Sequence, residues 1–275
     1  MKNKPYLLIL LCLCLLFAGC AARQSTAPTP VELTVSDTAV PPIDDTTLFS
    51  YEGQAPKTLL DFYKENPDTI GWLTIPGIKT DNVVMLGQTS KQYPVGANGQ
   101  NHYLDYSFNH TARTAGELYM DHRCRVTYNS MSENMTIYGH HMRDGTMLAG
   151  IDSYKREAYY KEHPYFTFHT LWGPKYFKVF GVFTVNLKVP ADAAFDYRQP
   201  TYGDGYDAFV SEVKQRSYYD TGVEVPTGTS MIALSTCTYP SGNPGYDNAR
   251  LVVMGRLCTD PDEIAQAQEM TKQAS

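Results

Sequence analysis

Short segments of alternating or continuous apolar residues recur between residues 70 and 257. Each is rich in β-branched, aromatic or aliphatic side chains, and most are bounded by Gly, Pro, Asn or Asp, which favour turns. The predicted strands are residues 70–75, 83–87, 116–121, 135–139, 165–170, 176–187, 229–237 and 250–257. Eight short strands with few helices predict a mainly β fold that is either a closed barrel or a sandwich.

Apolar residues at helical spacing predict helices in other parts of the chain. A short amphipathic helix is expected over residues 56–65, and a helical interruption near residues 146–161. The packing face of the first consists of Leu59, Phe62 and Tyr63. A further helix is expected over residues 204–216, with Asp204 as its N-cap. Its buried stripe consists of Tyr206, Phe209, Val210 and Val213.

The first 20 residues have the pattern of a secretory signal. Lys2 and Lys4 precede an apolar run over residues 6–18, as a charged n-region precedes an h-region. The run is shorter than the roughly 20 residues of a membrane-spanning helix. It ends in Phe-Ala-Gly-Cys, which resembles a lipobox with Cys20 as the acylated residue. An uncleaved signal anchor is the alternative, and both place the protein on the outer face of the cytoplasmic membrane.

The rest of the chain divides by composition. Residues 21–50 are rich in Pro, Thr, Ala, Ser and Asp, which is typical of a flexible tether. Residues 51–258 are expected to form one folded domain, since 275 residues are short for two large domains. Residues 259–275 are polar and are expected to form a frayed tail.

Charge and cysteine content narrow the possible functions. The net charge is −6, so no basic surface is expected to attract nucleic acid. Half of the six cysteines lie in the signal, which leaves Cys124, Cys237 and Cys258. A secreted protein with an odd number of cysteines commonly keeps one reactive thiol, and the other two either pair or stay buried.

The alternation of two strands places a thiol and a guanidinium together. If Ile232 and Leu234 face the core, then Cys237 and Ser235 face outward. The same argument turns Arg250 outward in the last strand. Antiparallel pairing through the loop between them would place Cys237 and Arg250 at one end of one sheet face. The alternative for Cys237 alone is an inert buried residue.

A thiolate nucleophile needs a histidine to accept and return a proton. Among the seven histidines, His140 directly follows a predicted strand and a glycine, a common place for a functional side chain. His140 and His141 are poorly suited to hold a metal together, because neighbours in an extended segment point to opposite faces and no HExxH spacing is present. We therefore expect no metal and no cofactor.

Several segments together resemble class B sortases, and they span residues 56–257. They are Asn66–Gly77, Tyr103–Leu104, Tyr138–Met147, His163–Phe168, Leu234–Cys237 and Arg250–Val253. The resemblance implies an eight-stranded sortase barrel with an amino-terminal helix. It also implies a helix-bearing crossover over residues 188–228, before the cysteine strand.

The resemblance further implies a cysteine transpeptidase. Cys237 would attack the Thr carbonyl of a sorting motif in a secreted protein, His140 would serve as acid and base, and Arg250 would stabilise the oxyanion. Ser235 is expected to contact the substrate, and His141 to be structural. The acceptor would be an amine of a cell-wall precursor or a pilin. Class B enzymes prefer motifs related to Asn-Pro-Gln-Thr-Asn or Pro-x-Thr-Gly.

The sequence departs from the family pattern in two places. Asp81-Asn82-Val83-Val84 replaces the usual Tyr-Pro-Val-Val. The loop between Cys237 and Arg250 lacks the acidic character of familiar members, so a third, acidic catalytic residue is not expected. Its distinctive residues are Pro240, Gly242, Pro244 and Gly245.

Other functions remain alternatives. A papain-like hydrolase needs its cysteine at a helix amino terminus and its histidine downstream, whereas here the histidine comes first and the cysteine lies in a strand. An L,D-transpeptidase would carry a His-Gly-Cys run, which is absent. An inactive, peptide-binding lipoprotein is a third reading, and the presence of all three of His140, Cys237 and Arg250 argues against it.

Overall fold

The computed structural model describes residues 40–87, 101–240, 242 and 248–273. The predicted signal and residues 21–39 of the predicted tether lie outside the described residues, as do Pro244 and Gly245 of the cysteine–arginine loop. In the described part of the chain, no helix is both long and apolar enough to cross a membrane.

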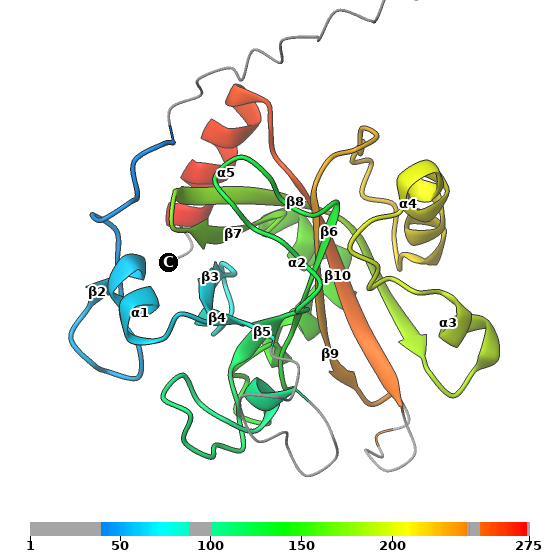
Figure 1. Ribbon diagram of the computed structural model, residues 1–275. Coiled ribbons are helices and arrows are strands. Elements are labelled where there is room, and N and C mark those ends of the chain that lie inside the picture. Colours follow the sequence, from blue (N-terminus) through cyan, green and yellow to red (C-terminus); the bar gives the residue numbers. More distant parts are fainter. Residues whose placement is uncertain (1–39, 88–100, 241, 243–247, 274–275) are drawn as a thin grey trace, which may run out of the picture. The chain divides into compact units, whose positions relative to one another are not determined.

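Eight strands form a closed barrel (Figure 1). They are β3 (Thr69–Thr74), β4 (Asp81–Leu86), β5 (Leu118–Met120), β6 (Asn134–Tyr138), β7 (Tyr165–Thr170), β8 (Gly173–Asn186), β9 (Met231–Thr238) and β10 (Ala249–Leu257). Their order is β10-β8-β7-β3-β4-β5-β6-β9, with β4–β5 and β6–β9 parallel and the other pairs antiparallel. The predicted mainly β fold is confirmed, as a barrel and not a sandwich.

Alternate side chains of the strands fill the barrel. Ile232 and Leu234 of β9 and Leu251 and Val253 of β10 belong to one fully buried cluster. Their neighbours in sequence face the other way, because successive residues of a strand point to opposite faces. Burying an aliphatic side chain of this size stabilises the fold by about 1.5–3 kcal/mol. The alternation of these two strands therefore fixes which residues face outward.

The crossover between β8 and β9 covers part of the outer face. It contains α3 (Pro190–Ala194), η3 (Gly203–Gly205) and α4 (Tyr206–Arg216). Phe209 and Val213 of α4 pack in a second apolar cluster with Val252 and Met254 of β10. Asp204 does not cap α4, which is a correction: it lies inside η3, and Gly205 occupies the N-cap position without a side-chain hydrogen bond.

The amino-terminal helix α1 (Leu59–Glu65) follows a two-stranded pair of β1 (Leu48–Phe49) and β2 (Lys57–Thr58). A capping box between Thr58 and Asp61 satisfies its first turn. Leu59 and Phe62 are buried as predicted, whereas Tyr63 is 40% exposed. Asp81 begins β4 with a local hydrogen bond from Thr74 Oγ1 (2.8 Å).

The predicted tether ends earlier than residue 50. Asp44 accepts a hydrogen bond from His169 Nε2 of β7 (2.7 Å), and its amide donates to the Leu171 carbonyl (2.8 Å). The Phe49 ring stacks on Trp72 of β3 at 4.8 Å. These residues pack on the barrel because their carboxylate and aromatic side chains find partners that lie far away in the sequence.

The expectation of a frayed carboxyl-terminal tail is wrong for α5 (Pro261–Gln273). Ala267 is fully buried in a small cluster with Tyr165 and Cys258. Polar anchors add to this, since Tyr165 donates to Gln266 (3.0 Å) and Arg256 pairs with Glu263. A helix with so few apolar residues is stable because the barrel supplies the surface on which it packs.

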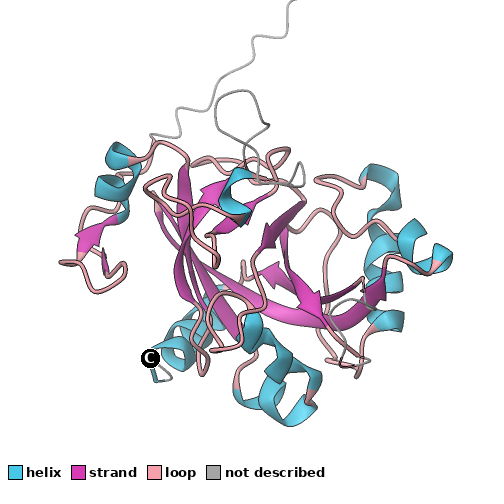
Figure 2. Cartoon of the chain, turned by 90° about the horizontal axis from the view of Figure 1, so that it is seen from below, coloured by secondary structure: helices cyan, strands magenta, loops and turns pink. Residues whose placement is uncertain are grey.

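Short helices close the remaining connections. The predicted helical interruption is confirmed as η2 (Ala149–Lys155) and α2 (Glu157–Glu162). Ile151 and Tyr154 of η2 belong to the barrel-interior cluster. A single turn, η1 (His102–Leu104), lies before β5. The helices surround the strands, as the view from below shows (Figure 2).

Candidate active site

Cys237 and Arg250 are direct partners across the β9–β10 ladder. Directly opposite residues of an antiparallel pair have Cβ atoms about 4.5–5.5 Å apart. Both lie on the outer face, opposite to the inward Leu234 and Leu251. The structure therefore brings the thiol and the guanidinium together as the alternation predicts.

His140 comes to the same place from β6. This strand runs parallel to β9 with Tyr138 level with Ser235. The alignment continues one residue further, because the Gly139 amide donates to the Ser235 carbonyl (3.3 Å) and Thr236 Oγ1 donates to the Gly139 carbonyl (2.8 Å). The next residues are His140, which follows the end of β6, and Cys237 of β9.

A backbone carbonyl fixes the imidazole of His140. Its Nε2 lies 2.8 Å from the carbonyl oxygen of Leu104, the last residue of η1. A carbonyl only accepts, so Nε2 carries the proton and Nδ1 remains as the basic nitrogen. Sequence reasoning had used Leu104 only as part of a family resemblance and missed this contact.

The three side chains line one cavity of about 530 Å³. Ser235, the predicted substrate contact, lies in its wall, and its hydroxyl is 2.9 Å from that of Tyr197. Tyr197 and Arg198 come from the crossover and were not anticipated. No periodic pattern marks them, and only the folding of the crossover over β9 brings them to the cavity.

Tyr239 is a second lining residue that the sequence did not reveal. Burial raises its pKa, and the neighbouring Cys237, which also forms a hydrogen bond with its hydroxyl, raises the pKa further. The lining thus places a neutral phenol beside the thiol. Tyr119, another lining residue, also has its pKa raised, chiefly by burial.

The other two cysteines have different surroundings. All three are free, so Cys124 and Cys258 do not pair. Burial raises the pKa of Cys124 to about 11 and that of Cys258 to about 12. Both stay protonated at neutral pH, whereas the thiolate is the nucleophilic form of cysteine. Cys237 is half-buried and lines the cavity.

His141 does not line this cavity. Its Nε2 lies 2.8 Å from the Asp152 carboxylate, which also pairs with Lys155 at 2.7 Å. The two adjacent histidines therefore have separate partners, as expected for neighbours in an extended segment. Among the described residues, no group of three or more His, Cys, Asp or Glu side chains is arranged to hold a metal.

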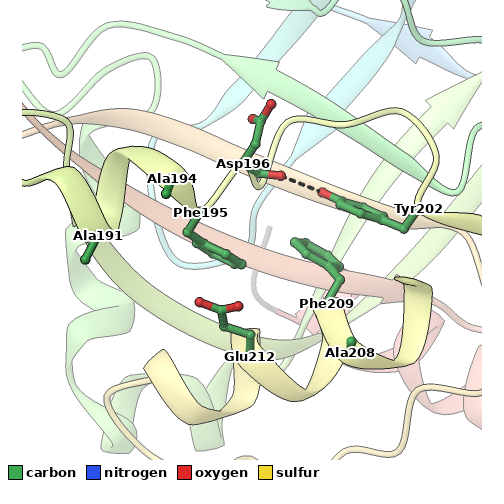
Figure 3. Close-up of a pocket in the computed structure, with 8 residues that line it drawn as sticks. All are labelled: Ala191, Ala194, Phe195, Asp196, Tyr202, Ala208, Phe209 and Glu212. Atoms are coloured by element: carbon green, nitrogen blue, oxygen red, sulfur yellow. Dashed lines mark hydrogen bonds between the residues drawn. The ribbon is translucent and has the colours of Figure 1, made fainter. Parts of the chain in front are cut away.

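A separate hollow of about 370 Å³ lies between α3 and α4 (Figure 3). Phe195, Tyr202 and Phe209 form an aromatic wall, with the Tyr202 and Phe209 rings stacked at 3.8 Å. Its lining includes none of the three predicted catalytic residues. The chemistry is therefore concentrated in the cavity at the ends of β6, β9 and β10.

The sequence of this chain is similar to those of two proteins named sortase B. No protein-family model matches the chain. Sortase B of Listeria monocytogenes is 27% identical over 218 residues, which are 78% of this chain and 80% of that protein. Sortase B of Staphylococcus aureus is 28% identical over 178 residues, which are 63% of this chain and 65% of that protein. The predicted resemblance to class B sortases is thus confirmed.

Solved structures of sortase B have the same fold. The Listeria monocytogenes enzyme matches with a TM-score of 0.56 and 26% identity, over 73% of this chain and 100% of that one. A Staphylococcus aureus sortase B–substrate complex matches with a TM-score of 0.59 and 24% identity, over 73% and 84%. A sortase B complexed with triglycine matches with a TM-score of 0.59 and 23% identity, over 73% and 85%.

The similarity to sortase B identifies the protein as a cysteine transpeptidase. The position of Cys237 agrees with this, because it lies in a barrel strand. A papain-like hydrolase, with its cysteine at a helix amino terminus, is excluded by that position.

Proposed function

We propose that Cys237, His140 and Arg250 carry out the transpeptidation. His140 takes the proton of the Cys237 thiol, and the resulting thiolate attacks a peptide carbonyl. As the C–N bond breaks, His140 passes that proton to the departing amine. An incoming amine then attacks the thioester, loses its proton to His140 and releases the thiolate. In both steps Arg250 donates hydrogen bonds to the oxyanion.

The observation that carries this proposal is the register of three strands. Cys237 lies opposite Arg250 on β10, and the β6–β9 alignment brings His140 level with it. Each therefore reaches the same cavity from a different strand end. Rigid strands hold catalytic groups more precisely than loops do.

We infer the substrate class from the similarity to sortase B. The matched Staphylococcus aureus sortase B is described as a substrate complex, and another sortase B as complexed with triglycine. We infer that this chain acts on the sorting signal of a secreted protein, of the kind related to Asn-Pro-Gln-Thr-Asn or Pro-x-Thr-Gly. The acceptor is an amine, supplied by a cell-wall precursor or a pilin, and Ser235 contacts the bound peptide.

We also propose that residues 1–20 anchor the enzyme to the outer face of the cytoplasmic membrane, through lipidated Cys20 or an uncleaved signal. Residues of the predicted tether then separate the barrel from the bilayer. Substrates that arrive at the same membrane reach the cavity at a raised local concentration.

Mass spectrometry of the full chain in detergent tests the proposal. The chain is mixed with a panel of sorting peptides, and we expect a mass increase that maps to Cys237 as a thioester. Triglycine should discharge the adduct and appear in a peptide product. The Cys237→Ala variant is the control. An absence of adducts with every peptide, in a chain whose Cys237 still reacts with a thiol reagent, would contradict the proposal.

A further inference from the structure

The residues on either side of Cys237 are both threonines that face into the barrel. Thr236 and Thr238 are only 1% and 2% exposed, while Cys237 between them is half-buried. This follows from strand alternation, since the neighbours of an outward residue point inward. A buried hydroxyl needs a hydrogen-bond partner, and each of these has one.

Thr236 is bonded to the residue before His140. Its Oγ1 donates to the Gly139 carbonyl at 2.8 Å. The approach is close on the other side as well, because a Cβ on Gly139 would lie 2.4 Å from Leu118 Cδ2. The backbone that enters His140 is therefore confined between β5 and β9.

Thr238 is connected to the residue after His140, through two charged side chains. Lys155 Nζ donates to Thr238 Oγ1 at 2.8 Å and pairs with Asp152 at 2.7 Å. Asp152 Oδ2 in turn lies 2.8 Å from His141 Nε2, which must donate because a carboxylate only accepts. Lys155 and Asp152 both belong to η2.

We propose that these two connections form a clamp that sets the position of His140 relative to Cys237. The clamp consists of Thr236, Thr238, Lys155, Asp152 and His141. It joins the neighbours of one proposed catalytic residue to the neighbours of the other. The inference rests on the proposed roles of His140 and Cys237, and the clamp members are positioning residues.

The geometry explains why such a clamp is needed. Strand β6 ends at Tyr138, so His140 lies beyond the regular pairing with β9. Proton exchange requires donor and acceptor within about 2.6–3.2 Å. A misplacement of roughly 1 Å costs about 100-fold in rate. Side-chain connections from both neighbours restore the alignment that the backbone ladder no longer provides.

The charged half of the clamp, which is the connection through Lys155, Asp152 and His141, adds little to the stability of the fold. The Asp152 side chain is 40% exposed and that of Lys155 is 35% exposed. Exposed ion pairs contribute little to folding. Burial alone would raise the pKa of Asp152, but the hydrogen bonds from His141 and Lys155 outweigh it and lower the pKa. The carboxylate is thus ionised at neutral pH, and variants of this half are expected to fold.

The first test compares two lysines in full-length chains. Lys155→Met removes the ammonium but keeps a long side chain, and we expect kcat for peptide cleavage to fall about 10-fold with little change in KM. Lys155→Arg should recover most of the loss. Lys161→Met is the matched control, since Lys161 is an exposed residue of α2 that pairs only with Glu157 among the described residues. All three should melt within about 3 °C of the wild type.

A double-mutant cycle tests whether the charged residues act as one connection. Lys155→Met combined with His141→Phe should lose no more activity than the more damaging single change, because the same connection is broken twice. Lys155→Met combined with Thr236→Val breaks both connections, so its losses should at least multiply.

The outcomes separate the two proposals. A wild-type chain that never forms an acyl-enzyme overturns the proposed function, and the clamp with it. An active wild type whose Lys155→Met variant matches Lys161→Met overturns the clamp alone. Independent, multiplying losses for Lys155→Met and His141→Phe would also overturn it.

Discussion

Each end of β10 carries an arginine with a cysteine nearby, but the two arginines have different interaction partners. At the first end, Arg250 donates to the neighbouring Ala249 carbonyl (3.0 Å) and pairs with no carboxylate among the described residues. At the other end, Arg256 forms a bidentate ion pair with Glu263 of α5, in which Nη2 of Arg256 lies 2.7 Å from Oε1 of Glu263. A guanidinium held by a carboxylate in this way stabilises the fold, whereas the proposed role of Arg250 is to stabilise charge that develops on the substrate.

The two cysteines also differ in their surroundings. Cys237 faces Arg250 across the ladder and lines the cavity. Cys258 follows β10 at the other end, where it is 4% exposed beneath α5. Burial raises its pKa to about 12. The same residue types thus have a proposed catalytic role at one end and a packing role at the other, and their surroundings account for the difference.

Removing each of the two thiols in turn should produce the largest difference between the two ends of β10. Cys237→Ala is expected to abolish peptide cleavage and transfer, because no other covalent carrier is present in the proposed mechanism. Cys258→Ala should retain turnover, with a lower thermal midpoint from the cavity it leaves. Turnover assays and melting curves on both variants check this. Residual transpeptidation by Cys237→Ala would remove Cys237 from its role.

The next largest difference in activity is expected between variants of the two adjacent histidines. His140→Ala removes the proposed acid and base, and we expect a loss on the order of 100- to 10,000-fold in kcat. His141→Ala removes only one clamp member and should cost about 10-fold. Single-turnover acylation of both variants measures the difference. Equal losses would contradict the separate roles that their different hydrogen-bond partners indicate.

The arginines offer the most direct test of the comparison. Arg250→Ala is expected to slow acylation on the order of 100- to 1000-fold with little change in melting temperature. Arg250→Lys should recover part of it, because lysine keeps the charge but not the planar fork. Arg256→Ala should do the reverse, with acylation retained and stability lowered by about 1–3 kcal/mol, because Glu263 loses one of its two partners and keeps only Lys178. A destabilised Arg250→Ala with normal acylation would assign that residue to the fold.

The smallest effect concerns pH. Because the pKa of Cys124 is raised to about 11 and that of Cys258 to about 12, both stay protonated, and therefore unreactive, until the pH approaches these values. Of the three cysteines that follow the predicted signal, an alkylating reagent at pH 8 should modify only Cys237 in the folded protein. Peptide mapping across a pH series measures this, and the unfolded chain, in which all thiols react, is the control. Labelling of Cys258 before Cys237 at pH 8 would refute the contrast.

The sequence alone determined a large part of this protein. All eight strand ranges agree with the structure to within three residues, because alternation and turn residues are local features of the chain. The same alternation was sufficient to place Cys237 and Arg250 on one outward face. The choice of His140 depended on its place after a strand and on a family resemblance.

Only the tertiary structure decided the rest. The parallel pairing of β6 with β9, the Leu104 carbonyl on His140 and the arrival of Tyr197 beside Ser235 all join residues far apart in the chain. The helix α5 was mistaken for a frayed tail because its single fully buried apolar residue, Ala267, is a weak pattern without the barrel beneath it. Local periodicity shows which face of an element is buried, but its partner is set by the packing of the whole core, which no short stretch of sequence contains.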